Sequence, residues 1–152
     1  IRDRAEGVHT NLDTSGNPFT DQEPWHSGWL ELMKYTDLVM LDIKQIDEQE
    51  HIKLTGHSNK NILAMARELS DMKKPVWIRH VLVPGGSDKD EYLHRLADFI
   101  HTLSNVERVE VLPYHTLGKF KWENLGLSYP LEGVNPPTQE RIDNARKILG
   151  AI

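Results

Sequence analysis

Short apolar runs rich in β-branched residues alternate along this chain with longer segments of helical periodicity. Such runs are typical of strands, and apolar residues spaced three and four apart are typical of amphipathic helices. The strand-like runs cover residues 8–14, 37–44, 76–84 and 106–115, and the helix-like segments cover residues 61–74, 91–103 and 136–149. Strands that alternate with helices connect through right-handed crossovers into a parallel sheet. The sequence therefore predicts an α/β fold whose sheet is either open or part of a barrel.

The size of the chain and its first residues indicate one domain of a larger fold. With 152 residues, the chain is long enough for a single hydrophobic core. Four parallel strands alone would leave two exposed edges, which complete folds avoid. The chain begins with Ile1, and residues 1–7 have the composition of a last helical turn ended by Gly7. We therefore expect residues 1–152 to form one domain, the C-terminal part of a protein whose N-terminal part is absent.

The composition argues against several classes of partner. The formal net charge is -5 and the isoelectric point is about 5.9, with basic residues spread along the chain, which disfavours nucleic acid. No apolar run approaches the roughly 20 residues of a membrane span, and no signal sequence is recognisable. The absence of cysteine excludes disulfides and thiolate-bound metals within this chain. We expect a cytoplasmic protein with neither nucleic-acid nor membrane partners.

Polar residues lie toward the carboxyl end of each of the four predicted strands. In parallel α/β folds the functional groups gather at the carboxyl ends of the strands, because the loops there converge. The polar residues at these ends are Asp13 and Thr14, Asp42 and Lys44, Arg79 and His80, and His115. We expect a functional site at this edge of the sheet.

Asp42 and Lys44 share one face of their strand with Met40, because side chains alternate along a strand. A carboxylate and an ammonium in one buried layer are costly unless they are paired or neutralised by a ligand. Two interpretations stay open. The two groups hold an amino acid-like or ribose-bearing ligand, or they form a solvated ion pair where the strand ends.

Asp13 and His115 also allow two interpretations each. Asp13 precedes a turn-forming Ser-Gly-Asn sequence and is either an Asx-turn residue or a ligand for a cation or substrate. His115 directly follows a strand, where an imidazole serves as a base, as a ligand or as a ring that stacks on a nucleobase.

The remaining polar features are predicted to be structural. Residues 83–88 lack the spacing of a phosphate-binding loop, and we predict a strand-to-helix turn in which Ser87 or Asp88 caps the helix. Five further histidines fall in helical or loop contexts and are predicted to be surface groups: His26, His51, His57, His94 and His101.

Several segments resemble those of a known enzyme family. They are HTNLDTSG from His9, TDLVMLDIKQ from Thr36, VWIRHVLVPG from Val76, VERVEVLPYHTLGKFKW from Val106 and LEGVNPP from Leu131. Together they resemble the activating enzymes of pyruvate formate-lyase, which belong to the radical S-adenosylmethionine superfamily. The resemblance extends from His9 over nearly the whole chain. It implies a partial TIM-like barrel of six βα units, of which this chain supplies the last four strands.

The resemblance also implies cofactors and partners. A 4Fe-4S cluster would be held by a CxxxCxxC loop, and a GGE segment would contact S-adenosylmethionine; neither motif occurs in this chain. In such enzymes a flavodoxin-type donor reduces the cluster, S-adenosylmethionine is cleaved to a 5'-deoxyadenosyl radical, and this oxidoreductase activity generates a glycyl radical on a loop of pyruvate formate-lyase. Without cluster ligands, the fragment alone is expected to be inactive.

Position by position, the resemblance assigns roles to individual residues. Asp42, Ile43 and Lys44 match the segment that contacts S-adenosylmethionine, and His115 matches a histidine at its nucleoside part.

The same matching places a monovalent cation near the strand ends, where a substrate contact is also predicted. Asp13, Thr14, Met40 and Asp42 match the positions around the cation, for which oxygen ligands are suitable. Arg79, which is expected to point from its strand toward the barrel, is predicted to contact the substrate loop.

Three alternatives remain. The chain belongs to an activating enzyme of a different glycyl-radical enzyme, or it is a non-catalytic half-barrel that associates through its open edges. The third is a barrel-type metal-dependent hydrolase that uses His9, Asp42, His80 and His115, although the sequence lacks the HxH pair expected of such enzymes.

Overall fold

A computed structural model describes residues 6–151 of the chain. The helix end predicted at residues 1–7 lies mainly outside these residues. The strands are β1 (Asn11–Thr14), β2 (Leu38–Asp42), β3 (Val76–Leu82) and β4 (Val106–Pro113). The helices are α2 (Trp25–Lys34), α3 (Glu48–Thr55), α4 (Lys60–Asp71), α5 (Asp90–His101), the 3-10 turn η1 (Thr116–Gly118), α6 (Lys119–Asn124) and α7 (Gln139–Leu149).

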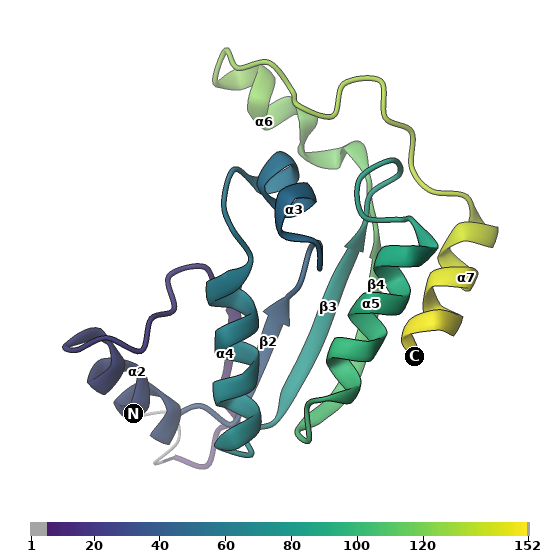
Figure 1. Cartoon of the computed structure of the whole chain (residues 1–152). Coiled ribbons are helices and arrows are strands. Elements are labelled where there is room, and N and C mark those ends of the chain that lie inside the picture. The colour runs from purple at the N-terminus through teal and green to yellow at the C-terminus, as the bar shows by residue number, and fades with distance from the viewer. Residues whose placement is uncertain (1–5, 152) are drawn as a thin grey trace.

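The four strands form one parallel sheet in the order β1-β2-β3-β4 (Figure 1). The register places Asp13 beside Met40 and Asp42 beside Arg79, and β3 continues along β4 to its end. Each strand pairs with the next strand in the chain through a connection that contains at least one helix. The predicted α/β fold with parallel βα units is confirmed, although β1 is shorter than predicted.

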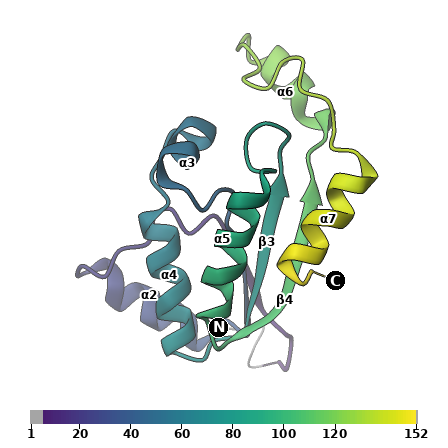
Figure 2. The same ribbon diagram turned by 45° about the vertical axis from the view of Figure 1, so that its right-hand side comes forward.

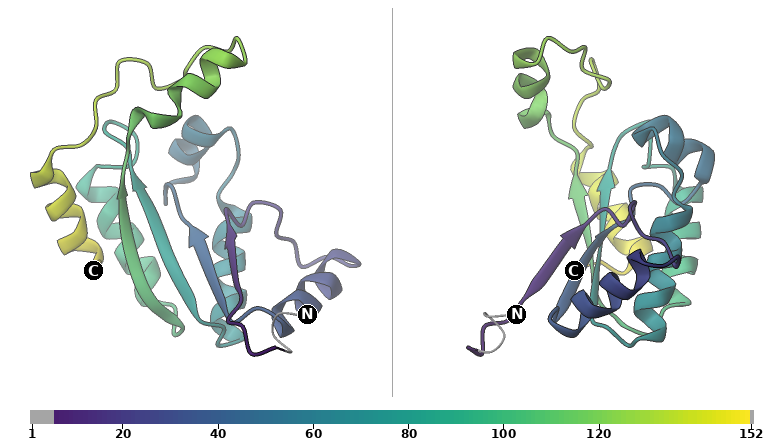
Figure 3. Two further views of the ribbon diagram at one scale, coloured as in Figure 1. Left: turned by 180° about the vertical axis from the view of Figure 1, so that it is seen from behind. Right: turned by 90° about the vertical axis from the view of Figure 1, so that its left-hand side faces the viewer.

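The helices cover one face of this sheet. Figures 2 and 3 show α4 and α5 lying against that face, with α7 beside α5 and β4. Within residues 6–151, no helix lies over the opposite face, and α6 stands beyond the carboxyl ends of the strands (Figure 3). In a closed barrel of βα units the uncovered face would be the interior.

The two faces differ because apolar and polar residues alternate along the strands. On β2, Val39 and Leu41 are fully buried against the helices, whereas Met40 and Asp42 are only partly buried on the uncovered face. The core is completed by the apolar stripes of the helices, such as Met65 on α4. Burial of each such large apolar side chain contributes about 1.5–3 kcal/mol. The alternation therefore both stabilises the sheet and leaves polar groups on its free face.

Three helices were not predicted from the sequence. α3 carries no continuous apolar stripe and is defined instead by its ends: Asp47 accepts hydrogen bonds from the amides of Gln49 and Glu50, and Gly56 ends the helix in the left-handed conformation. α2 contains Gly28, a poor helix former, and α6 spans only six residues. Among the described residues, no helix has the length and hydropathy needed to cross a membrane.

The segment between β4 and α7 contains η1 and α6 and is otherwise irregular. It is held together by its own contacts: the hydroxyl groups of Tyr114 and Tyr129 are 2.7 Å apart, and Lys119 pairs with Glu132 at 2.8 Å. Several of its large apolar side chains are exposed, including Leu117 and Leu125. The start of α7 is capped by Thr138, whose hydroxyl accepts a hydrogen bond from the amide of Arg141.

The turn after β1 packs tightly against the core at Gly16. This residue has a φ of +69°, a backbone conformation that residues with a side chain rarely adopt. A Cβ atom here would lie 2.9 Å from Cδ1 of Leu41 and 3.2 Å from Sδ of Met65. The glycine thus allows the loop that follows β1 to cross the top of the core.

Replacing Gly16 by alanine should destabilise the chain by about 2–5 kcal/mol, because backbone strain and overpacking add. Gly126→Ala is a matched control, since Gly126 has a φ of +66° and nothing within 4 Å of the added carbon. The control should lose only about 1–2 kcal/mol. Urea unfolding of both variants measures the difference, and equal losses would contradict the close approach at Gly16.

Candidate functional site

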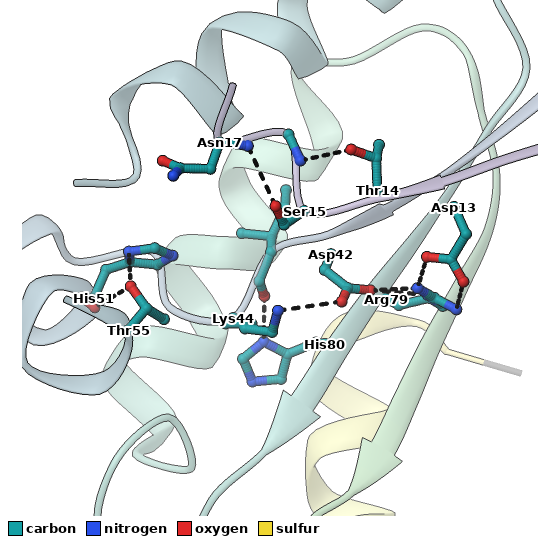
Figure 4. A network of polar contacts seen from close by, with 12 residues as sticks. Asp13, Thr14, Ser15, Asn17, Asp42, Lys44, His51, Thr55, Arg79 and His80 are labelled. Atoms are coloured by element: carbon teal, nitrogen blue, oxygen red, sulfur yellow. Dashed lines mark hydrogen bonds and ion pairs between the residues drawn. The ribbon is translucent and has the colours of Figure 1, made fainter. Parts of the chain in front are cut away.

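Charged side chains from three strands meet at the carboxyl edge of the sheet. Arg79 of β3 extends over the uncovered face toward Asp42 of β2 and Asp13 of β1, and Lys44 lies on the other side of Asp42 (Figure 4). The register of the strands brings these groups together, because Asp42 and Arg79 are direct neighbours and both point away from the helices. We call Asp13, Asp42, Lys44 and Arg79 the charged cluster.

Arg79 is the centre of the charged cluster. Its Nε donates to Oδ1 of Asp42 at 2.9 Å and its Nη1 donates to Oδ2 of Asp13 at 2.9 Å, and Nη2 contacts both carboxylates. Burial works to lower the pKa of Arg79, but the hydrogen bonds and charges of Asp13 and Asp42 outweigh it, so the pKa is raised. The guanidinium is therefore a permanent cation that links two strands through their carboxylates.

Lys44 completes the charge balance. Its Nζ lies 3.4 Å from Oδ2 of Asp42, and the side chain of Asp42 is only 18% exposed against 36% for Lys44. The cluster thus contains two carboxylates and two cations. The ion pair between Asp42 and Lys44, one of the two interpretations of the sequence, is present, but Asp42 is mostly buried and is shared with Arg79.

The turn after β1 does not depend on Asp13. The hydroxyl of Thr14 accepts a hydrogen bond from the amide of Gly16 at 3.0 Å, whereas the carboxylate of Asp13 is bound to Arg79. The interpretation of Asp13 as an Asx-turn residue is therefore wrong. The physical reason is that Asp13 points to the uncovered face, where a cation lies within reach.

A cavity of about 190 Å³ lies beside the charged cluster, between the loop after β1 and helices α3 and α4. Its wall includes Asp42 and Lys44 from β2 and its following loop, Ser15 and Asn17 from the loop after β1, and His51 and Thr55 from α3. The charged cluster thus borders a concave space that is open to solvent on one side.

His51 is buried, although the sequence analysis placed it on the surface. Its side chain is 2% exposed, and Nδ1 lies 2.7 Å from the carbonyl oxygen of His57 and 3.0 Å from the hydroxyl of Thr55. The prediction was wrong because it did not include α3, whose inner face carries this residue. Nε2 of His51 is buried without a hydrogen-bond partner.

His80 is also buried, on the helix-covered face of β3. It is 2% exposed; Nδ1 lies 2.9 Å from the carbonyl oxygen of Ile43 and Nε2 lies 3.3 Å from that of Ser87. Burial lowers the pKa of His80 and outweighs the two carbonyl contacts, which act to raise it. The ring is therefore neutral near pH 7 and has a single N–H.

Two buried amides lie close to His80. Gln45, immediately after the Asp42-Ile43-Lys44 segment, is fully buried and donates to the carbonyl oxygen of Gly86 at 2.8 Å. Asn59, 2% exposed, donates to the carbonyl oxygens of Ile46 at 2.8 Å and of Gln45 at 3.1 Å. These bonds tie the segment after β2 to the loop after β3 and to the start of α4.

The loop after β3 is a strand-to-helix turn, as predicted, but its polar residues do not cap the helix. The hydroxyl of Ser87 donates to the carbonyl oxygen of Val81 and accepts from the amide of Val83, and Asp88 accepts from the amide of Gly85. The N-cap position of α5 is Lys89, without a side-chain bond. The capping prediction was wrong because bonds within the loop use these oxygens first.

His115 lies at the same edge of the sheet but outside the charged cluster. It follows β4, occupies the N-cap position of η1 and is exposed. Among residues 6–151, it makes no hydrogen bond to the charged cluster. Its assignment to the nucleoside part of a cofactor stays a prediction.

The four residues proposed for a metal-dependent hydrolase do not form a site. His80 faces the helices while Asp42 faces the opposite side of the sheet, and His9 is exposed near the start of the described chain. In the part of the chain that the structure describes, no group of three or more histidine or acidic side chains could hold a metal ion. The structure thus gives the hydrolase interpretation no support.

The sequence is similar to proteins named pyruvate formate-lyase-activating enzyme. The chain is 55% identical to one from Streptococcus mutans over 146 residues, 56% identical to one from Staphylococcus epidermidis and 53% identical to one from Staphylococcus aureus. Each match covers 96% of this chain but only 56–58% of the relative. The resemblance stated from the sequence is confirmed, and the chain spans little more than half the length of these curated relatives.

Solved structures show the same fold. A domain of a pyruvate-formate lyase-activating enzyme from Bacteroides vulgatus matches 98% of this chain and 80% of its own, with a TM-score of 0.76 and 22% identity. A radical SAM methyltransferase from Sphaerobacter thermophilus matches 95% of this chain and 39% of its own, with a TM-score of 0.63 and 18% identity. No family model matches the chain. At these identities, the structural matches establish the fold alone.

Replacing Arg79 by methionine should lower the free energy of unfolding by about 1–3 kcal/mol, because the mostly buried carboxylate of Asp42 loses its principal partner. Adding Asp42→Asn should recover part of this loss. Arg95→Met is the control, since the pair of Arg95 with Asp47 is 45% and 28% exposed and should contribute less than about 1 kcal/mol. Guanidinium unfolding separates the two cases; equal losses would argue against a special role of the charged cluster.

Proposed function

We propose that this chain is the S-adenosylmethionine-binding, C-terminal part of an enzyme that activates pyruvate formate-lyase by generating a glycyl radical on it. The observation that carries the proposal is the similarity, at 53–56% identity over 96% of the chain, to proteins with that name. The charged cluster and its cavity at the carboxyl edge of the sheet support it, because parallel α/β folds bind their ligands there.

Asp42 and Lys44 suit the amino acid end of S-adenosylmethionine. A carboxylate and an ammonium at the wall of one cavity complement the ammonium and the carboxylate of such a ligand. Ile43 lies between them, and His115 is proposed to contact the nucleoside part from the end of β4. When bound, S-adenosylmethionine supplies the carbon radical that removes a hydrogen atom from the partner enzyme.

The residues of this chain cannot hold a 4Fe-4S cluster through thiolates, because the chain contains no cysteine. Cluster ligands must therefore come from outside these 152 residues, and a flavodoxin-type protein is proposed as the electron donor to that cluster. The chain alone is expected to have no activating activity. Its contribution to the reaction is to bind and orient the cofactor.

A monovalent cation at Asp13, Thr14, Met40 and Asp42 would compete with Arg79. The guanidinium of Arg79 already bridges the carboxylates of Asp13 and Asp42. The hydroxyl of Thr14 already accepts a hydrogen bond from the amide of Gly16. We propose that binding of the cation releases Arg79 from Asp13, which leaves the guanidinium available for carbonyl groups of the substrate loop.

The cofactor assignment predicts weak, saturable binding of S-adenosylmethionine to this chain in a calorimetric or NMR titration. Lys44→Ala should weaken the binding about 10- to 100-fold, because a charge-assisted contact is lost. Lys53→Ala is the matched control, since Lys53 also pairs with an acidic residue, Glu50, at 2.6 Å but lies on α3. Equal affinities of the two variants would show that Lys44 does not contact the cofactor.

The function is tested by restoring the missing part. A chimera that joins the N-terminal portion of the Streptococcus mutans relative to this chain, reconstituted with iron and sulfide without oxygen, should generate a glycyl radical on pyruvate formate-lyase that is detectable by electron paramagnetic resonance. Asp42→Ala in the chimera should reduce the rate at least tenfold. A chimera with a bound cluster but no radical on pyruvate formate-lyase, and a radical on another glycyl-radical enzyme, would favour the alternative partner.

A further inference from the structure

Four buried polar side chains hold the segment after β2, the loop after β3 and the start of α4 through hydrogen bonds to the main chain. They are His80, Gln45, Asn59 and Ser87, each 2% exposed or less, and we call them the buried polar network. A buried polar group is destabilising unless it is hydrogen-bonded. Four buried polar side chains in one place therefore need a physical reason. Gln45, Asn59 and Ser87 have partners for their donors.

His80 has two acceptors in front of its ring but only one proton to donate. The neutral ring carries one N–H, and the carbonyl oxygen of Ile43 is closer than that of Ser87, at 2.9 Å against 3.3 Å. Nδ1 therefore carries the proton and donates to Ile43. Nε2 is left facing the oxygen of Ser87 without a proton, which is mildly unfavourable. The ring is thus positioned for its bond with Ile43.

Both main-chain polar groups of Ile43 form hydrogen bonds with residues of β3. Its amide donates to the carbonyl oxygen of Arg79 at 2.9 Å, and its own carbonyl oxygen accepts from His80. Its side chain is fully buried, while its neighbours Asp42 and Lys44 point to the charged cluster. The backbone that carries these two charged side chains is therefore fixed one residue beyond the regular end of β2.

We propose that His80 is a positioning residue for the cofactor segment 42–44, acting through the hydrogen bond from its Nδ1 to the carbonyl oxygen of Ile43. The proposal rests on the proposed function only in that this segment binds S-adenosylmethionine. His80 itself cannot touch that cofactor, because it is buried on the helix-covered face. A role as mere core filling would need the volume of the ring but not its N–H.

Two substitutions separate the hydrogen bond from the packing. The amide nitrogen of asparagine lies close to the position of Nδ1 of histidine, and that of glutamine lies close to the position of Nε2. His80→Asn should therefore keep the bond to Ile43, whereas His80→Gln reaches only toward Ser87. Both remove the ring and leave an amide, but asparagine is one methylene smaller, so packing alone would make His80→Asn the more disruptive change, opposite to the expectation from the hydrogen bond. His80→Phe keeps the ring and removes the N–H, which provides a third variant should the first two fold poorly.

The first readout is amide hydrogen exchange of Ile43 by NMR, which does not depend on any cofactor. His80→Gln and His80→Phe should accelerate exchange at Ile43 at least tenfold relative to amides of α5, and His80→Asn should change it less than threefold. Equal acceleration in His80→Asn and His80→Gln, or none in His80→Phe, would overturn the proposed bond.

The second readout is the affinity for S-adenosylmethionine in the same variants. His80→Gln and His80→Phe should weaken it about tenfold, with the affinity retained in His80→Asn. If the wild-type chain binds no S-adenosylmethionine but the exchange pattern is as expected, the proposed cofactor assignment fails and the positioning of segment 42–44 by His80 stands. If the wild-type chain binds and all three variants bind equally well, His80 does not position the segment.

Discussion

The ion pairs of Arg79 depend on the register of three strands, and the candidate site depends on those ion pairs. Arg79 lies beside Asp42 because β2 and β3 pair in register at this point, and it reaches Asp13 because β1 continues the same sheet. A shift of any strand by one residue would turn these side chains toward the helices. The apolar residues that alternate with them prevent such a shift, since Leu41 and Ile78 would then face solvent.

The two faces of the sheet have different roles. The covered face supplies stability through apolar packing against α4 and α5, and the uncovered face presents charges. The buried polar network crosses this division, because His80 stands on the covered face but bonds to the backbone between Asp42 and Lys44. A rigid support on one face can thereby fix charged groups on the other, which is a general requirement for binding sites.

The similarity to activating enzymes concerns proteins that are longer than this chain. The relatives are almost twice as long as the matched region, so their names describe proteins with parts that this chain does not contain. The residues present here form a charged edge beside a cavity, and they include no cysteine that could bind an iron-sulfur cluster. Asp13, Asp42, Lys44 and Arg79 contact one another without any group from outside this chain.

The sequence by itself determined the α/β fold with its parallel strands and the position of Asp13, Asp42 and Lys44 at or near the carboxyl ends of β1 and β2, whereas Arg79, predicted at a strand end, lies in the middle of β3. The correct predictions follow from periodicity and composition, which are local properties of the chain. It did not determine α3, the burial of His51 or the bonds of Ser87, because these depend on short polar segments whose structure is set by their surroundings. Only the tertiary structure decided that Arg79 bridges Asp13 and Asp42 and that His80 bonds to Ile43, since these partners are 37 or more residues apart and meet through strand register and helix packing.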